Sequence, residues 1–278
     1  MAVKRTIKEE VSLSGIGIHS GENVELFLKP SDSGKIILRR TDLKNLEMSI
    51  DPQRVKAKRG SSLETDAASV LTLEHLLASL YILGIDSVVV ELNGGEIPIM
   101  DGSAEPFVQA LQKAGIRPLP EQKRLMRVVK PHRIEGQDSY VIFSPYSEFK
   151  ITYTIEYDHP LIKKQELSIL LNVESFVKEI APARTFGFLK EVPALLQDGL
   201  ARGGSLANAV VLDDDGVMGG SLRFSDEFVR HKILDFVGDI SLLGYPVAGH
   251  FKAYKAGHRL HLEAVRFLLD NSEYWTLE

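Results

Sequence analysis

The segment DEFVRHKILDFVGD, residues 226–239, contains one histidine and several carboxylates at helical spacing. His231 and Asp235 are four positions apart, so a helix would present an imidazole and a carboxylate on one face about one turn apart. Asp239 extends that face by another turn. Two such ligands and a third from elsewhere would form a zinc site of nitrogen and oxygen donors with an open, catalytic position. A surface ion pair is the commoner meaning of this spacing, but the apolar flanks predict a buried helix, where such groups need a partner or a cation.

A second pair of ionisable residues, Glu74 and His75, interrupts the most apolar helical stretch of the chain. Two such groups are costly there without a function. His75 is the candidate third metal ligand, and the adjacent glutamate is placed to act as a general base on the attacking water, as in metal hydrolases. The segment is not the H-E-x-x-H motif of zinc proteases, and an ion pair at a helix end is the alternative interpretation.

Three further side chains complete the candidate chemistry. His258 follows a glycine at a predicted turn. If it lies in the same cleft, Asp239 would hold its imidazolium and raise its pKa, so that it donates a proton to a leaving amine. Thr185 offers a hydroxyl to an oxyanion, and Lys232 offers a cation to a phosphate or a polarised carbonyl. A turn histidine without chemistry is the other interpretation of His258.

The composition excludes several classes of function. The 278 residues are 44% hydrophobic and 26% charged, as in ordinary soluble proteins, and 33 Lys+Arg against 38 Asp+Glu give a net charge of −5. Such a balance exerts no general attraction on phosphate backbones, so no nucleic-acid partner is expected. Cysteine is absent, which excludes disulfides, thiolate metal sites and thiol nucleophiles. With neither a secretory signal nor an apolar run long enough to span a membrane, the expected location is the cytoplasm.

Two series of elements follow one another in the same order: strands, a helix, a strand, a loop and a helix. The first series has helices at 67–83 and 104–114 around a strand at 87–92, and the second has helices at 227–243 and 261–269 around a strand at 249–254. Residues 115–122, with two prolines, are the expected linker. We therefore predict two similar α+β domains, 1–118 and 123–278, with His75 and His231 facing one cleft. Two unrelated domains that share this order are the alternative.

Taken together, these segments resemble the zinc-dependent UDP-3-O-acyl-N-acetylglucosamine deacetylases, which catalyse the committed step of lipid A synthesis in Gram-negative bacteria. The resemblance covers almost the full chain. It rests on GIGIHSG at 15–21, TLEH at 72–75, EIPIMDGS at 96–103, ARTFGF at 183–188, DEFVRHK at 226–232 followed by Asp235 and Asp239, and GH at 257–258. Each segment is weak alone, but all of them in order are specific.

The resemblance implies a role for each candidate residue. One Zn²⁺ per chain, with Fe²⁺ as the alternative metal in the cell, would be bound by His75, His231 and Asp235. Glu74 would be the general base. His258, oriented by Asp239, would be the protonated partner. Thr185 would stabilise the oxyanion, and Lys232 would lie near the substrate diphosphate and carbonyl.

The resemblance also implies a fold and a substrate site. Helices would pack between two outer sheets, with the active site at the domain interface. An insert at about 192–216 would form an apolar passage for the 3-O-acyl chain, although its leucines and valines could equally be core. The expected substrate contacts are Tyr157, Glu156, Phe186, Lys255, His19, Leu200 and Leu206. Tyr157 takes the place of an aromatic residue that stacks on uracil, whereas a basic residue of some members falls near Ser139 and leaves that contact open.

The implied activity is metal-dependent hydrolysis of the N-acetyl group of UDP-3-O-[(3R)-3-hydroxyacyl]-N-acetylglucosamine. Acetate and UDP-3-O-acyl-glucosamine are the products. The expected partner is therefore a UDP-sugar that carries a fatty acyl chain, and the expected state is a monomer. Two alternatives remain at this stage: an N-deacetylase that acts on another N-acyl sugar, and a catalytically silent domain that uses the metal structurally.

Overall fold

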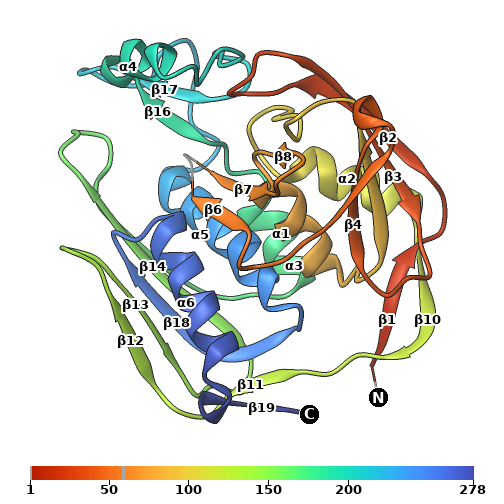
Figure 1. Cartoon of the computed structure of the whole chain (residues 1–278). Coiled ribbons are helices and arrows are strands. Elements are labelled where there is room, and N and C mark those ends of the chain that lie inside the picture. The colour runs from red at the N-terminus through yellow and green to blue at the C-terminus, as the bar shows by residue number, and fades with distance from the viewer. Residues whose placement is uncertain (1, 58–59) are drawn as a thin grey trace.

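Two β-sheets face each other across a layer of helices (Figure 1). The structure is a computed structural model that describes residues 2–57 and 60–278. The first sheet has the order β2 (Val11–Ile16), β3 (Asn23–Pro30), β9 (Val88–Leu92), β4 (Ile36–Arg40) and β5 (Leu46–Ser49). The second contains the series β12 (His132–Glu135), β13 (Tyr140–Ser144), β18 (Val247–Tyr254), β14 (Phe149–Tyr157) and β15 (Lys163–Leu170).

The two five-strand series repeat one topology. β9 is antiparallel to β3 and parallel to β4, and β18 is likewise antiparallel to β13 and parallel to β14. In each series the central strand follows a helix of the middle layer, α1 (Glu74–Leu83) before β9 and α5 (Glu227–Ile240) before β18. The α+β class predicted from the sequence is confirmed.

Alternating burial along the strands fixes which face of each sheet meets the helices. The inward positions of β3 and β14 are apolar and buried: Val24, Leu26 and Leu28 in one, and Phe149, Ile151 and Tyr153 in the other. The intervening positions are mostly polar and more exposed. Successive side chains of a strand point to opposite faces, so each sheet packs one face on the helical layer and leaves the other to solvent.

Helices α1 and α5 lie against each other at the centre of this layer. α1 is buried along most of its length and ends at Gly84, whose positive φ of 69° suits a residue without a Cβ. α5 approaches the first turn of α1 through Gly238, where any Cβ would collide with the backbone of Glu74. The two helices can therefore bring polar side chains from distant parts of the chain into direct contact.

The remaining elements surround these layers. The other helices are α2 (Glu105–Ala114), α3 (Val173–Ser175), which continues into a π-helical turn at Phe176–Ile180, α4 (Val192–Gln197) and α6 (His258–Asp270). β1 (Val3–Ile7) pairs with β10 (Ile116–Gln122), and β6 (Val55–Ala57), β7 (Ser61–Glu64) and β8 (Ser69–Val70) form a small sheet. β16 (Phe186–Phe188) pairs with β17 (Val210–Leu212), while β11 (Met126–Val128) and β19 (Trp275–Leu277) extend the second sheet.

Three local expectations are corrected by the structure. Residues 116–122 are a strand, β10, because they pair with β1 despite their two prolines. The helix expected from residue 67 begins at Glu74, because Ser69 and Val70 pair with β7. His258 is the first residue of α6, with Gly257 before it as the N-cap, and does not lie in a free turn. The pairing of β10 with β1 is a contact between distant parts of the chain, whereas the other two corrections arise from neighbouring segments.

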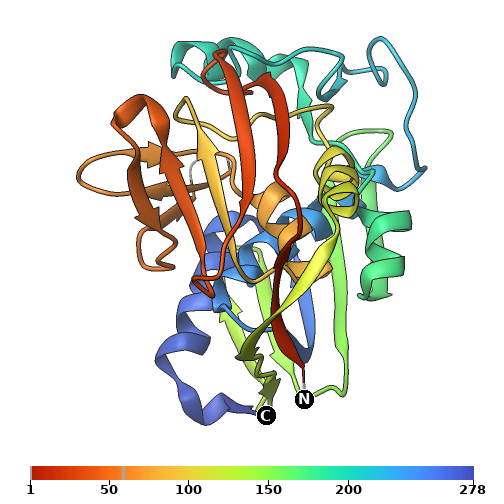
Figure 2. The same ribbon diagram turned by 90° about the vertical axis from the view of Figure 1, so that its right-hand side faces the viewer.

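The described ends of the chain lie together at one end of the molecule (Figure 2). The segment that connects the two halves of the chain is hydrogen-bonded to both of these ends. Lys123 N–H donates to Ala2 O at 2.9 Å, and Leu125 N–H donates to Glu278 O at 2.9 Å. Within the described residues, no helix combines the length and the apolarity that crossing a bilayer requires.

Candidate metal centre and active site

Two helices from different halves of the chain bring three potential metal ligands together. His75 lies in the first turn of α1, and His231 and Asp235 lie one turn apart on α5. Asp235 Oδ1 is 3.7 Å from His75 Nε2 and 3.2 Å from His231 Nε2. Each residue is at most 3% exposed, and one ligand atom from each lies within 4.8 Å of the others. The three residues that the sequence suggested as ligands therefore converge.

The protonation states of these groups fit a zinc ion. His231 Nδ1 lies 3.1 Å from Ala183 O, which can only accept, so Nδ1 carries the proton and the Nε2 lone pair faces the other two residues. Burial lowers the pKa of His231 to about 4, which keeps its imidazole neutral. Burial alone would raise the pKa of Asp235, but His231 and Lys232 hold it well below its usual value. Two imidazoles and a carboxylate suit Zn²⁺ with an open position.

The imidazole of His75 supports the same conclusion. Its Nδ1 is buried and has no hydrogen-bond partner among the residues that the structure describes. Its Nε2 faces Asp235 at a distance too long for a hydrogen bond. Because Nε2 faces a carboxylate oxygen without a hydrogen bond between them, its position is compatible with a cation bound by both groups.

Glu74 lies beside the three ligands as a potential base. Ser61 N–H donates to Glu74 Oε2 at 2.9 Å, which fixes one oxygen. The other, Oε1, faces His258 Nε2 at 3.8 Å. Burial raises the pKa of Glu74. A carboxylate of raised pKa accepts a proton more readily than an ordinary one, which is the property that a general base needs.

His258 and Asp239 form a potential acid on the other side of the same space. His258 Nδ1 lies 2.7 Å from Asp239 Oδ2, and its Nε2 lies 3.8 Å from both Glu74 Oε1 and Asp235 Oδ2. Burial alone would lower the pKa of His258, but the charge and hydrogen bond of Asp239 raise it to about 10. The imidazole is therefore protonated at neutral pH and presents Nε2–H toward the metal ligands.

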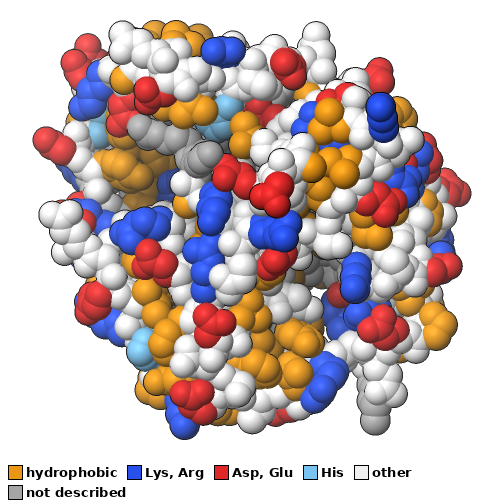
Figure 3. Space-filling view, viewed as in Figure 1, with side chains coloured by type: hydrophobic (Ala, Val, Ile, Leu, Met, Phe, Trp, Pro, Cys, Tyr) orange, Lys and Arg blue, Asp and Glu red, His pale blue; other side chains and the backbone are white. Residues whose placement is uncertain are grey.

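A cavity of about 660 Å³ is lined by Glu74, His75, His231, Asp235 and His258. Thr185 is held in its wall by backbone bonds, from its own N–H to Gly102 O and from Val210 N–H to its carbonyl, each 2.8 Å long. Lys232 also lines it, with Nζ 2.8 Å from Asp235 Oδ2. The segment around α4 contributes an apolar part of the cavity wall. Its lining residues are Val192, Leu195, Leu206, Val211 and Met218. Figure 3 shows hydrophobic side chains at a hollow of the surface below this segment.

A sequence model of the UDP-3-O-acyl N-acetylglycosamine deacetylase family matches residues 4–270. The chain belongs to this deacetylase family. It is 47% identical over 276 residues to the UDP-3-O-acyl-N-acetylglucosamine deacetylase of Thermodesulfovibrio yellowstonii, a match that covers 99% of this chain and 94% of that relative. The enzyme of the same name from Syntrophus aciditrophicus is 44% identical over 284 residues, which cover 99% of this chain and 89% of that relative. The one from Geotalea uraniireducens is 42% identical over 282 residues, which cover 100% of this chain and 92% of that relative.

Four of the seven substrate contacts expected from the deacetylase family lie in this cavity. His19, Tyr157, Phe186 and Leu206 are among its lining residues. Tyr157 packs edge-on against Phe186, with their ring centres 5.8 Å apart. The other three, Glu156, Lys255 and Leu200, are not among the described residues that line it, and their roles stay predictions.

Glu156 and Lys255 instead have partners at the surface. Glu156 accepts a hydrogen bond from the Tyr254 hydroxyl at 2.6 Å, and Lys255 pairs with Asp138 at 2.6 Å.

Several functional neighbours were not found from the sequence. Asp239 also accepts hydrogen bonds from the Ser61 hydroxyl and from His261 Nδ1, the latter at 2.8 Å. His261 Nε2 in turn lies 2.9 Å from the Tyr153 hydroxyl, which donates to Ala256 O at 2.7 Å. The spacing of His258 and His261 on α6 was a usable signal for His261. Nothing local pointed to Ser61 or Tyr153.

The Asp239 cluster resembles a metal site in composition but differs in its hydrogen bonds. Asp239, His258 and His261 offer atoms within 4.8 Å of one another. However, both imidazoles point an Nδ1 at the carboxylate within hydrogen-bond distance, and a carboxylate without a proton can only accept. These nitrogens therefore carry protons and are not free to bind a cation.

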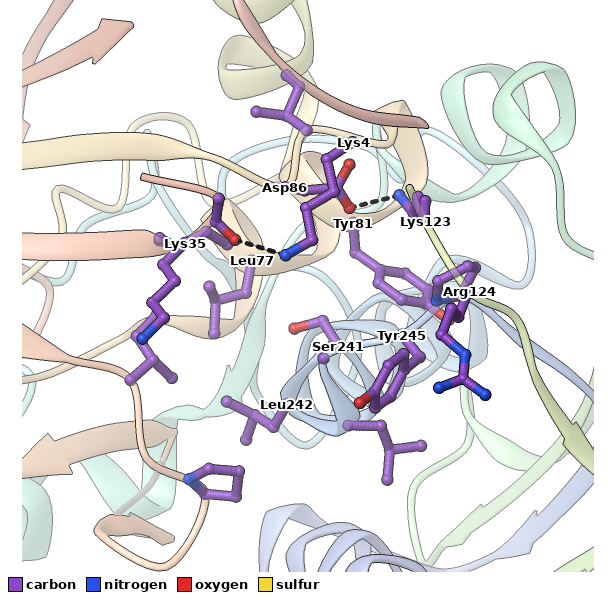
Figure 4. Close-up of a pocket in the computed structure, with 18 of the residues that line it drawn as sticks. Lys4, Lys35, Leu77, Tyr81, Asp86, Lys123, Arg124, Ser241, Leu242 and Tyr245 are labelled. Atoms are coloured by element: carbon purple, nitrogen blue, oxygen red, sulfur yellow. Dashed lines mark hydrogen bonds and ion pairs between the residues drawn. The ribbon is translucent and has the colours of Figure 1, made fainter. Parts of the chain in front are cut away.

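A second cavity, of about 590 Å³, lies on another side of the helical layer (Figure 4). Tyr81 and Tyr245 line it together with lysines of both halves. Lys123 pairs there with Asp86 at 2.5 Å, and Lys4 donates to Gly34 O at 3.1 Å. The described residues around it include no histidine. It offers no set of groups comparable to the metal centre.

Proposed function

We propose that His75, His231 and Asp235, with Glu74 and His258 beside them, form the catalytic centre for the activity of this family. That activity is the deacetylation of UDP-3-O-acyl-N-acetylglucosamine in lipid A biosynthesis, a zinc-dependent amide hydrolysis. The observation that carries the assignment is the convergence of two imidazoles and a carboxylate, a base and a protonated acid in one cavity. A site with only a structural metal would need neither the base nor the acid.

Zinc would be held by His75 Nε2, His231 Nε2 and Asp235, and when bound it would supply the Lewis acidity that polarises the acetamide carbonyl and acidifies the attacking water. The chain itself provides the proton transfers. Glu74 Oε1 takes a proton from the water as its oxygen attacks the carbonyl carbon, while Ser61 N–H holds the other oxygen of the carboxylate. The Thr185 hydroxyl donates to the oxygen on which negative charge develops.

Breakdown of the tetrahedral adduct requires a proton on the sugar nitrogen. His258 Nε2–H donates that proton as the carbon–nitrogen bond breaks, and acetate and the free amine are the products. Asp239 holds the imidazolium through Nδ1, so the acid is charged and oriented before the substrate binds. The base and the acid therefore face one reacting centre from the two halves of the chain.

The shape of the cavity suits the rest of the substrate. The apolar end formed by the 192–216 insert would receive the 3-O-acyl chain, with Leu206 in its wall and Leu200 nearby in the sequence. Lys232 would meet the diphosphate or the carbonyl, and Tyr157 would stack on uracil, with Phe186, His19, Glu156 and Lys255 as further contacts.

We also propose domains at 1–118 and 123–278, supported by the repeated sheet topology. One chain supplies every group, so a monomer would suffice.

The test is acetate release from UDP-3-O-acyl-N-acetylglucosamine by the purified chain. Release should stop with a zinc chelator and return when zinc is added. Glu74→Ala should lower the rate by about 10²–10⁴-fold while zinc stays bound. Full activity of Glu74→Ala with zinc present would overturn the assignment of the base. Equal activity on unacylated and acylated sugars would favour the alternative, a deacetylase of another N-acyl sugar.

A further inference from the structure

Glu96 is a fully buried carboxylate that lies outside the metal centre and joins two parts of its surroundings. It is 0% exposed. Its Oε1 accepts hydrogen bonds from His19 N–H and from the Thr72 hydroxyl, both at 2.9 Å, and its Oε2 accepts one from Ser20 N–H at 2.8 Å. A buried carboxylate is stable only when such donors surround it, and donors to a charged group form strong hydrogen bonds. We refer to these three bonds as the Glu96 clamp.

One arm of the Glu96 clamp holds the turn that begins α1. Thr72 has a φ of 60°, which is strained for a β-branched residue, and it lies two positions before Glu74. The turn is also bound to the backbone around Glu96, because Leu71 N–H donates to Gly95 O and Ile97 N–H donates to Leu71 O, each at 3.0 Å. The position of the proposed base therefore depends on a strained turn that Glu96 helps to hold.

The other arm holds the loop at residues 17–21. A Cβ at Gly17 would collide with the Glu96 carboxylate, so glycine permits this close approach. The loop carbonyls of Ile18 and His19 accept hydrogen bonds from Gly203 N–H at 3.1 Å and Arg202 N–H at 3.3 Å. Ala201 and Gly204, on either side of these two residues, line the cavity. Through this loop, Glu96 of the first half supports a wall contributed by the second half.

We propose that Glu96 is a positioning residue that sets the general base and the wall of the acyl passage together. The proposal rests on the proposed function, because it needs Glu74 to be the base and the 192–216 insert to receive the acyl chain. Loss of the clamp would let the Thr72 turn relax, which lowers the rate on every substrate. It would also release the 17–21 loop, which weakens the contribution of a long acyl chain. A purely structural glutamate would have no effect that depends on acyl-chain length.

Four variants separate the two arms. Glu96→Gln keeps the shape but replaces one acceptor oxygen with an NH₂ group, which opposes a loop N–H in either orientation of the amide. It also removes the negative charge from the bond to the Thr72 hydroxyl, so it weakens both arms. Thr72→Val keeps the β-branched shape and removes only the hydroxyl, so it disturbs the α1 arm alone. Thr72→Ser keeps the hydroxyl and is its matched control. Ser20→Ala alters the loop but keeps the Ser20 N–H, so it is the control for the loop arm.

The measurements are kcat and KM with a long-chain and a short-chain 3-O-acyl substrate, at full zinc occupancy confirmed by elemental analysis. Glu96→Gln should lower kcat by about 10–100-fold on both substrates, as expected for a displaced catalytic group. It should also lower the long-to-short ratio of kcat/KM by about 10-fold, the size of one lost polar contact. Thr72→Val should lower kcat on both and leave the ratio within about 2-fold, and Thr72→Ser and Ser20→Ala should resemble the wild type.

The outcomes are distinct. Wild-type activity of Glu96→Gln, or equal losses on both substrates, would overturn the proposal. If Glu96→Gln does not fold, Thr72→Val decides, because wild-type kcat in that variant would show that the clamp does not position the base. Failure of the wild-type protein to release acetate from the long-chain substrate would instead refute the proposed function.

Discussion

Asp235 and Asp239 are buried carboxylates one turn apart on α5, yet their surroundings differ. Asp235 faces the Nε2 atoms of two imidazoles, and the proton of one, His231, is held on the opposite nitrogen by Ala183 O. Asp239 accepts hydrogen bonds from two imidazole Nδ1 atoms and a serine hydroxyl. In the first environment Lys232 binds Oδ2 of Asp235 and leaves Oδ1 facing the two imidazoles, whereas in the second environment the imidazoles already donate protons to the carboxylate. One helix therefore offers a cation site and a proton-holding site from the same residue type.

The largest effect is expected from removing the first carboxylate. Asp235→Ala should reduce bound zinc from one per chain toward none after dialysis, because two buried imidazoles alone hold the ion weakly. Acetate release should fall by about 10³-fold or more. Elemental analysis together with the acetate assay checks both. Full zinc content in Asp235→Ala would exclude this residue as a ligand.

Removing the second carboxylate should affect the proton and not the metal. Asp239→Asn should keep one zinc per chain and lower kcat by about 10²–10⁴-fold, because the acid is no longer charged and oriented. In the wild type the pKa of His258 is raised to about 10, so the acid is present at lower pH and lost as pH approaches 10. Without Asp239 this loss should move to lower pH. A pH–rate profile with an unmoved alkaline limb would contradict the assignment.

A smaller effect is expected from Ser61, which contacts both Glu74 and Asp239. Ser61→Ala removes the hydroxyl that donates to Asp239 but keeps the N–H that donates to Glu74. Because two imidazole donors remain on Asp239, kcat should fall only about 3–10-fold, the effect of one hydrogen bond. Steady-state kinetics at constant zinc occupancy measures it. A loss as large as that of Asp239→Asn would show that the serine has a direct chemical role.

A third buried carboxylate of α5, Glu227, should affect stability more than chemistry. It accepts hydrogen bonds from the backbone and side chain of Arg184 and from Arg223 N–H. Burial alone would raise the pKa of Glu227, but these donors hold it below its usual value. Glu227→Gln should lower the free energy of unfolding by about 1–3 kcal/mol at neutral pH.

The pH dependence of that loss is the check on the cause. A lowered folded-state pKa means that the contribution of Glu227 is complete above the ordinary glutamate pKa and disappears as pH falls through the folded value. The difference in stability between wild type and Glu227→Gln, measured by denaturant unfolding, should therefore shrink in acid. A constant difference would point to packing and not to the charge.

The residues proposed to do the chemistry were more predictable from the sequence than the residues that hold them in place. The spacing of His231, Asp235 and Asp239 requires only that residues 226–239 form a helix, and a helical pattern is a local property. Ser61 and Asp239 are 178 positions apart, and only the packing of the two halves makes them neighbours. No local rule predicts such a contact.

Pairing between strands explains two of the errors in the elements. Residues 116–122 form a strand because β1 is available to pair with them, and the first helix starts late because β8 pairs with β7. The positive φ of Thr72 is likewise invisible in the sequence, since a β-branched residue normally argues against that conformation. Thr72 is held there by its bond to Glu96 and by the backbone bonds of its neighbour Leu71 to Gly95 and Ile97. Residues 95–97 belong to another segment.

We propose that the Asp235 site on α5 holds the metal and that the Asp239 site does not. X-ray absorption at the zinc edge counts the imidazoles bound to the ion directly. We expect two imidazoles with oxygen ligands in the wild type, an unchanged spectrum in Asp239→Asn, and one imidazole or no zinc in His231→Ala. A third imidazole in the wild type, or an unchanged spectrum in His231→Ala, would contradict it.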